Sequence, residues 1–421
     1  MPRYFLLGLL LSVYSYSGKA QHLYTLYNNG NSPLPDNTIR SIALGPDSSI
    51  WIGTDFGLCR LKEGNWNVYQ TNNSGLPDNS VRTIAFDQDN NVWVGTFLGG
   101  LAILSDTGWA VYSISNSRLP DNHVRAIAFD TAGLPWIGTT GGLVEMRDTG
   151  WHIYTSNNSP MWVNSISSIY IDPNNKKWIG TTNGGLATLV DTSWIIYRIA
   201  NSEIPDNTIM AMEPGDNGIL WCAFPAVGAG AFNGTDWLNF NIVNSNNPSN
   251  ALTNLSIAPN GHIFFSSLNE GLIRYRGGLI WDQYATNLNP DTANEFLPED
   301  NLLCVLADID SSVWIGTSSQ GLVHMQYVSV IDDTTGLATI DETSMVIFPN
   351  PSTDFVSVRS KHLIESVEIV DLHSKKWRTL LNITTQETTI PLDGLPSGMY
   401  MMGLAINGQK IWRPFQIISV N

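Results

Sequence analysis

One short motif recurs along the first three quarters of the chain. Its seven copies are IWIGT at Trp51, VWVGT at Trp93, PWIGT at Trp136, KWIGT at Trp178, LWCAF at Trp221, IFFSS at Phe264 and VWIGT at Trp314. Successive copies stand 42, 43, 42, 43, 43 and 50 residues apart. A period of this length with several short strand signals in each unit is typical of a radial array of small sheets, and the sequence lacks the 3.6-residue hydrophobic period of helical repeats.

The second unit shows how each repeat is built. Its four strand signals are VRTIAFD (81–87), VWVGT (92–96), GLAILS (100–105) and WAVYSI (109–114). Asp, Asn and Gly separate these signals, as tight turns require. The connector NSRLPDN (116–122) then leads to the next unit, and its Pro fixes φ at the corner. Seven such units predict an all-β fold, a seven-bladed β-propeller.

The start of the mature chain predicts how the ring closes. Residues 22–28 match only the fourth strand of a unit, whereas the last unit ends after GLVHMQ (321–326) without a fourth strand. We therefore expect a propeller closed by an N-terminal strand, with residues 22–28 on the outer edge of the last blade. Such a pairing hides the edges that an open ring would expose.

Residues 1–20 have the features of a signal peptide. Arg3 precedes an apolar run, and the small residues Gly18 and Ala20 precede Gln21. The apolar run holds roughly 11 residues, too few to span a bilayer. We therefore predict export, a propeller over residues 21–328 and no transmembrane helix in the mature chain.

Net charge, cysteine spacing and acidic hairpins limit which partners and cofactors this chain is expected to bind. The formal net charge of −16 argues against nucleic acid and anionic membranes, which need a basic surface. Cys59, Cys222 and Cys304 fall inside strand motifs without CxxC spacing, so we expect buried, inert thiols. Aspartates gather in hairpins at 87–91, 172–176 and 308–312, but a calcium loop with a distal Glu is missing, and turns favour Asp. We expect neither a metal nor another cofactor.

Units of the form LPDNxVRxIAxDxxxxxWIGTxxGGLxxL resemble the two-component-regulator propeller repeat of Bacteroidetes-type bacteria, and the resemblance covers roughly residues 22–328. It implies a periplasmic sensor module or scaffold, often linked to carbohydrate responses. In that family a membrane helix and a kinase follow the propeller. This sequence shows neither, so we do not expect it to signal by phosphorelay itself.

The C-terminal segment has a different pattern. A polar linker is predicted at 329–343, and residues 344–421 then alternate with period two, as a small Ig-like β-sandwich does. The FPNP opening (348–351), the VEIVD strand (367–371) and the SGMY strand (397–400) resemble the C-terminal sorting domain of the type IX secretion system. This resemblance implies the type IX machinery as a partner, with passage through the periplasm to the outer cell surface or the medium.

Motifs for catalysis are missing from the sequence. The seven histidines form neither HExxH nor HxH spacing, and GxSxG and P-loop motifs are absent. His123 precedes Arg125 in a connector, a position that could reach a ligand, but we interpret it as an exposed turn residue. We therefore expect a non-enzymatic binding or display module for an extracellular glycan or protein. The alternative is a propeller-type polysaccharide lyase or hydrolase, with Arg neutralising a uronate and His or Tyr moving protons.

Candidate ligand contacts come from positions at which the repeats differ. Eleven residues before each motif aromatic stand Arg40, Arg82, Arg125, Ser167, Met210, Thr253 and Leu303. Three adjacent arginines could form a crescent at the central channel, and guanidinium groups suit carboxylate or sulfate. Alternatively, each Arg binds a connector carbonyl or the Asp of its own corner: Asp36, Asp78 and Asp121.

Aromatic residues add further candidates. The loops after the WIGT motifs should lie on the same face as the LPDN corners, where Phe56, Phe97 and Trp162 are candidate ligand contacts. The repeated tryptophans of the second and fourth strands are instead expected to pack between blades.

Overall fold

The computed structural model describes residues 21–147, 150–278, 280–286, 297–328, 345–348, 355–371, 376–396, 398–406 and 409–417. In these residues the chain is all-β, apart from one 3-10 turn, η1 (Asp216–Gly218). The expected signal peptide (1–20) and linker (329–343) lie outside the described residues. A membrane-spanning helix does not occur in the described part of the chain.

The described residues between 21 and 328 form seven four-stranded antiparallel sheets, numbered here 1 to 7 in chain order. Sheet 1 contains β2 (Ile39–Leu44), β3 (Ile50–Thr54), β4 (Leu58–Lys62) and β5 (Asn65–Tyr69). Sheet 2 contains β6 (Val81–Phe86), β7 (Val92–Thr96), β8 (Leu101–Ser105) and β9 (Gly108–Tyr112). Sheet 3 contains β10 (Val124–Phe129), β11 (Pro135–Thr139), β12 (Leu143–Glu145) and β13 (His152–Tyr154). Each repeat of the sequence therefore makes one sheet.

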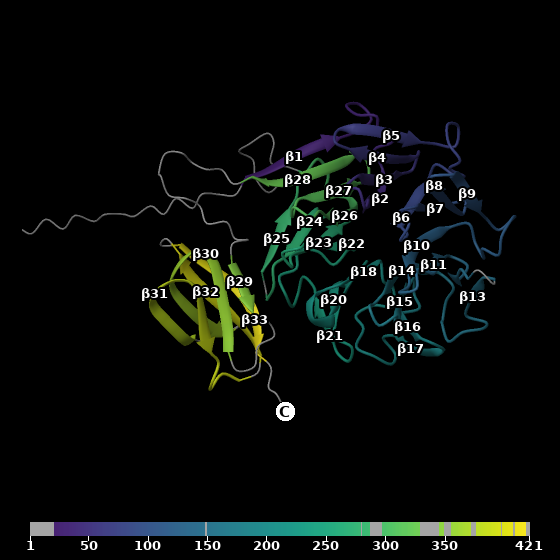
Figure 1. Cartoon of the computed structure of the whole chain (residues 1–421). Helices are drawn as coiled ribbons and strands as arrows, with labels where there is room; N and C mark the ends of the chain where they lie inside the picture. The colour runs from purple at the N-terminus through teal and green to yellow at the C-terminus, as the bar shows by residue number, and fades with distance from the viewer. Residues whose placement is uncertain are drawn as a thin grey trace, which may run out of the picture.

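The remaining sheets repeat this pattern. Sheet 4 contains β14 (Ile166–Ile171), β15 (Lys177–Thr181), β16 (Leu186–Val190) and β17 (Ser193–Tyr197). Sheet 5 contains β18 (Ala211–Pro214), β19 (Leu220–Phe224), β20 (Gly228–Phe232) and β21 (Trp237–Phe240). Sheet 6 contains β22 (Leu252–Ile257), β23 (Ile263–Ser267), β24 (Leu272–Tyr275) and β25 (Trp281–Tyr284). The first strands of successive sheets lie side by side, and β2 also contacts β26 of sheet 7, so the sheets form a ring (Figure 1).

Sheet 7 joins the two ends of this ring. It contains β26 (Leu302–Ala307), β27 (Val313–Thr317), β28 (Leu322–Val328) and, as its outer strand, β1 (Gln21–Tyr27). The antiparallel register pairs Tyr27 with Leu322, which confirms the pairing expected for the N-terminal strand (Figure 1). β28 continues two residues beyond the expected end at 326.

The repeated aromatics pack between neighbouring sheets, as predicted. Trp51 of sheet 1 is buried in a cluster with Val81 and Val94 of sheet 2. On the outer strands, the rings of Tyr69 and Trp109 meet edge to face with centroids 5.9 Å apart. The glycine of the WIGT motif permits this close packing, because a Cβ added at Gly53 would lie 2.6 Å from Val81 Cγ1.

The C-terminal residues form a separate five-stranded sheet. Its strands are β29 (Met345–Phe348), β30 (Phe355–Asp371), β31 (Lys376–Pro391), β32 (Gly398–Ile406) and β33 (Gln409–Ile417). The long strand β30 pairs with β29, β31 and β32. Val356, Ile369, Met402 and Leu404 belong to a buried cluster of this sheet alone. The alternating pattern of the sequence therefore produces a second hydrophobic core.

All three cysteines are buried free thiols, as predicted. Burial raises the pKa of Cys59 to about 12 and also raises the pKa values of Cys222 and Cys304. A thiol that stays protonated is a poor nucleophile and metal ligand, so these side chains serve packing.

Candidate functional site

The first strands of the seven sheets surround a central cavity of about 650 Å³. Its wall includes every residue of the register that lies eleven positions before the motif aromatics. We call this ring the mouth layer; it consists of Arg40, Arg82, Arg125, Ser167, Met210, Thr253 and Leu303. The channel-side position predicted for the three arginines therefore agrees with the geometry.

In six of the seven sheets a β-bulge places the mouth-layer side chain on the cavity wall; in sheet 5, Met210 directly precedes β18. In sheet 1, Ile39 pairs with Thr54 and Ser41 with Gly53, which leaves Arg40 as the extra residue between them. The same interruption leaves Arg82, Arg125, Ser167, Thr253 and Leu303 unpaired in their sheets. A bulge bends the strand and redirects one side chain. The repeat thus delivers one variable side chain per sheet to the cavity.

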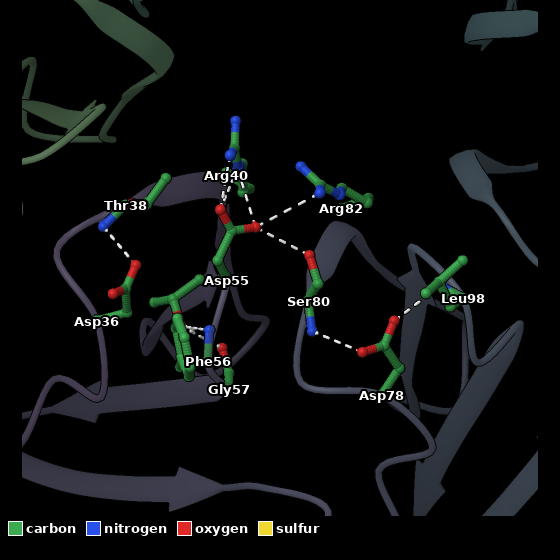
Figure 2. Close-up of polar contacts among 11 residues, drawn as sticks. Asp36, Thr38, Arg40, Asp55, Phe56, Gly57, Asp78, Ser80, Arg82 and Leu98 are labelled. Carbon is green, nitrogen blue, oxygen red and sulfur yellow. Dashed lines mark hydrogen bonds and ion pairs between the residues drawn. The ribbon is translucent and has the colours of Figure 1, made fainter.

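Asp55 is the carboxylate that organises the basic side of the mouth. Arg40 Nε donates to both Asp55 oxygens at 3.1 Å, and Arg40 Nη2 donates to Oδ2 at 2.6 Å (Figure 2). Asp55 Oδ1 lies 3.4 Å from Arg82 Nη2 and accepts a hydrogen bond from Ser80 Oγ at 2.8 Å. Burial raises the pKa of Asp55, but the hydrogen bonds from Arg40 and Ser80 and the two positive charges lower it below its ordinary value.

The aspartates predicted as alternative partners of the arginines were wrong, because each forms its hydrogen bonds with backbone N–H groups instead. Asp36, Asp78 and Asp121 each accept a backbone hydrogen bond from the residue two positions later, at 2.8, 3.1 and 2.7 Å. Asp78 also accepts one from Leu98 N at 2.7 Å (Figure 2). These aspartates stabilise the connector turns, because a short carboxylate side chain caps its own turn more readily than it reaches the channel.

Arg125 differs from Arg40 because the side chains that accept its hydrogen bonds are uncharged. Its Nη1 donates to Thr182 Oγ1 at 2.9 Å and to Ser165 Oγ at 3.2 Å, both from sheet 4 or its connector. Burial is the main cause that lowers the pKa of Arg125, and the positive charge of Arg82 lowers it further. Burial and the charge of Arg40 likewise lower the pKa of Arg82. The mouth therefore holds guanidinium groups that repel one another.

Phe97 and His123 complete this basic side. Phe97 is 37% exposed, and Arg82 Cζ lies 4.7 Å from the centroid of its ring. The His123 ring meets Phe97 edge to face at 4.6 Å, and both residues line the cavity. His123 is half-buried, so the interpretation as an exposed turn residue was wrong. Burial and the charges of Arg125 and Arg82 lower its pKa below the ordinary value.

Two of the candidate aromatics lie outside the cavity wall. Phe56 is 57% exposed and Trp162 is 64% exposed, and neither contributes to the cavity lining. The guanidinium of Arg198 lies 3.8 Å from the centroid of the Trp162 ring. The loops after the WIGT motifs do lie beside the LPDN corners, as predicted, since Phe97 N donates to Ser80 O and Thr140 N to His123 O.

Among the described residues, a single carboxyl group contributes to the lining at the far end of the cavity. Glu213 Oε2 accepts a hydrogen bond from Ile257 N at 2.8 Å. Burial raises the pKa of Glu213 to about 7, although the hydrogen bonds from Ile257 and Ser256 oppose this rise. The two ends of the cavity therefore differ in electrostatic character.

The acidic hairpins serve the local fold. Asp87 accepts backbone hydrogen bonds from Asp89 and Asn91 and one from the indole of Trp93 at 2.8 Å. The described part of the chain holds no group of three or more His, Cys, Asp or Glu side chains with metal-binding geometry. These aspartates orient turns and tryptophans.

Comparisons with known proteins match both parts of the chain. Residues 33–56 and 75–97 match the family described as two component regulator propeller, and residues 346–418 match the secretion system C-terminal sorting domain. Among curated proteins, none is similar in sequence to this chain.

Several solved structures share the fold. PorZ, described as an essential surface component of the type IX secretion system of Porphyromonas gingivalis, is 17% identical with a TM-score of 0.55, and the match covers 91% of this chain and 60% of PorZ. The extracellular domain of the hybrid two-component system BT3049 from B. thetaiotaomicron is 20% identical with a TM-score of 0.60, covering 94% and 57%. Virginiamycin B lyase from Staphylococcus aureus is 14% identical with a TM-score of 0.58, covering 73% and 100%.

These likenesses establish a common fold at low sequence identity. The chain spans about three-fifths of the length of the first two structures. The sorting domain at residues 346–418 marks the protein for the type IX pathway and hence for the cell surface or the medium. The chain thus carries two-component regulator propeller repeats followed by a type IX secretion system C-terminal sorting domain.

Proposed function

We propose that this protein is a non-enzymatic binding or display module whose cavity mouth receives an acidic group of an extracellular glycan, protein or small molecule. In this proposal the seven sheets are the blades of a seven-bladed propeller over residues 21–328. In the same proposal the C-terminal domain expected over residues 344–421 is an Ig-like β-sandwich that the type IX machinery recognises. The propeller is thereby delivered to the outer surface with its cavity intact.

The charge at the mouth carries this proposal. Arg40, Arg82 and Arg125 bring three positive charges and Asp55 one negative charge, so these four groups sum to +2 in a chain whose formal net charge is −16. The charge of Asp78, which caps its own turn, also acts on Arg82. Arg82 Nε is buried and has no hydrogen-bond partner within the described residues. An incoming carboxylate or sulfate would offset the mutual repulsion of these groups and could accept paired hydrogen bonds.

Catalysis is supported less well than binding. A lyase or hydrolase needs an acid and a base placed on either side of the reacting bond. His123 stands at the mouth, but no tyrosine lines the described cavity. Glu213 follows Met210 of the mouth layer by three residues, which is about 10 Å along a strand. Virginiamycin B lyase shares the fold, and at 14% identity this supports only the fold.

A binding comparison tests the proposal. We would titrate the mature chain with glucuronate and with inorganic sulfate by calorimetry, and compare wild type with Arg125→Ser. Arg118→Ser is the matched control, because Arg118 is exposed in a connector and lies away from the cavity lining. Loss of binding in Arg125→Ser alone supports the proposal. Equal binding by all three proteins contradicts it, and conversion of a bound glycan detected by mass spectrometry would support the enzyme instead.

A further inference from the structure

Below the mouth layer the cavity wall changes from charged to apolar. The next residue of each first strand forms a small-residue layer: Ser41, Thr83, Ala126, Ser168, Ala211, Asn254 and Cys304. One residue further comes an aliphatic layer: Ile42, Ile84, Ile127, Ile169, Met212, Leu255 and Val305. The aliphatic layer follows the mouth layer by two residues, or about 7 Å along the strands.

The aliphatic layer is unevenly exposed around the ring. Met212, Leu255 and Val305 are buried, whereas the four isoleucines Ile42, Ile84, Ile127 and Ile169 are only half-buried. These isoleucines come from sheets 1 to 4, and three of these sheets also supply the arginines. The same side of the cavity therefore presents positive charge at the mouth and incompletely covered aliphatic surface deeper down.

Polar groups of the wall are mostly unavailable to a hydrophilic ligand. Thr253 Oγ1 donates to Leu302 O at 2.8 Å, Ser167 Oγ donates to Ile209 O, and Asn254 Oδ1 accepts from Val305 N. The hydroxyls of Ser41 and Ser168 have no hydrogen-bond partner within the described residues, but they are buried over Gly53 and Gly180. Thr83 is the exception, because its methyl group faces Gly95. A sugar ring at this depth would lose hydration without regaining its hydrogen bonds.

We infer that the ligand is a small amphipathic carboxylate, in which the charged group binds the arginine mouth and a directly attached aliphatic or aromatic segment packs on the isoleucines. The inference rests on the proposed function and specifies its ligand. A cavity of about 650 Å³ suits a small molecule, and small-molecule sites are mostly apolar with a few polar groups that fix orientation. Burial of the segment adds affinity that a hydrophilic anion cannot gain.

A ligand series on the wild-type mature chain tests this inference without altering the fold. We would titrate acetate, butyrate, n-hexanoate, n-octanoate, glucuronate and the neutral analogue 1-hexanol by calorimetry. Affinity should rise by about fourfold per methylene from acetate to hexanoate, and hexanoate should bind more tightly than both glucuronate and hexanol. Ile84→Ala should weaken hexanoate without affecting acetate, and Ile114→Ala is the matched control because Ile114 is exposed in a connector.

The outcomes separate the two proposals. If all the alkanoates bind with the same affinity, and glucuronate binds equally or more tightly, the inference of an amphipathic ligand is overturned. The proposed anion site is still supported in that case. Failure of every carboxylate and of inorganic sulfate to bind overturns the proposed function as well. If Ile84→Ala does not fold, the wild-type series decides alone.

Discussion

Asp55, in the loop after β3 of sheet 1, lies 3.4 Å from the guanidinium of Arg82 in sheet 2. The same carboxylate holds Arg40 with a bidentate pair, in which Arg40 Nε donates to Oδ1 and Nη2 donates to Oδ2. Asp55 therefore crosses the boundary between two sheets and fixes two of the three arginines at the cavity mouth (Figure 2). It also neutralises part of their charge, so it couples the stability of the ring to the affinity of the site.

Replacing Asp55 should separate these two effects. Asp55→Asn removes charged hydrogen bonds, so the free energy of unfolding should fall by roughly 1–2 kcal/mol. Carboxylate binding at the mouth should tighten by roughly two- to fivefold, since one competing negative charge is gone. Asp106→Asn, in an exposed turn, is the control for both measurements. A higher free energy of unfolding for Asp55→Asn than for wild type, or weaker anion binding by this variant, would contradict this role of Asp55.

Acid should abolish the stabilisation from Asp55. Its pKa in the folded protein is lowered, so the carboxylate stabilises the fold above the unfolded-state pKa of about 4, and this contribution is lost as the pH falls through the folded-state pKa. Melting temperatures of wild type and Asp55→Asn should differ near neutral pH and converge in acid. A difference that persists unchanged at the lowest pH would argue against an ionic role.

His123 should titrate below its ordinary pKa of 6.5 in the free protein. At pH values between the folded-state pKa and 6.5, the unfolded chain binds a proton that the native protein does not. Protonation of this residue therefore opposes folding as the pH falls below 6.5. An NMR titration of the ring should show the pKa rising in Arg125→Ser and on anion binding, because each change makes the surroundings less positive. A pKa of 6.5 or above in the free wild type would refute this.

Deleting residues 21–27 should open the ring. The deletion removes β1, exposes the edge of β28 and eliminates the stacking of Tyr27 on Trp314, whose ring centroids are 6.2 Å apart. We expect a substantially lower melting temperature and increased aggregation. Tyr27→Phe is the control, because it keeps both the N-terminal strand and the aromatic side chain that stacks on Trp314. An unchanged transition after deletion would show that β1 contributes nothing to closure.

Residues 344–421 should be needed for surface delivery and dispensable for folding of the ring. In a type IX-competent host, a chain that ends near residue 330 should remain in the periplasm with a cooperative melting transition. The control is the full chain in the same host. The sorting role fails if the shortened chain reaches the surface at normal levels.

The repeat made the ring and the cavity wall predictable from sequence. Arg40, Arg82 and Arg125 occupy one register in consecutive units, so alignment alone places them together. Asp55 was not identified as their partner, because the loops that follow WIGT share no residue type and a contact between sheets leaves no local pattern. His123 was misjudged for a related reason: its burial depends on Phe97 of the preceding sheet. Trp162, although unusual in its connector, lies outside the cavity lining.

The arginine mouth is tested most directly by titrating glucuronate and n-hexanoate into wild type and the triple variant Arg40→Ser/Arg82→Ser/Arg125→Ser, at low and at high salt. Serine is chosen because sheet 4 already carries Ser167 at this register. We expect wild type to bind at least one of these carboxylates, salt to weaken this binding, and the folded triple variant to bind neither. This result would establish the arginine mouth as the binding site. Undiminished, salt-independent binding by the triple variant would contradict this assignment.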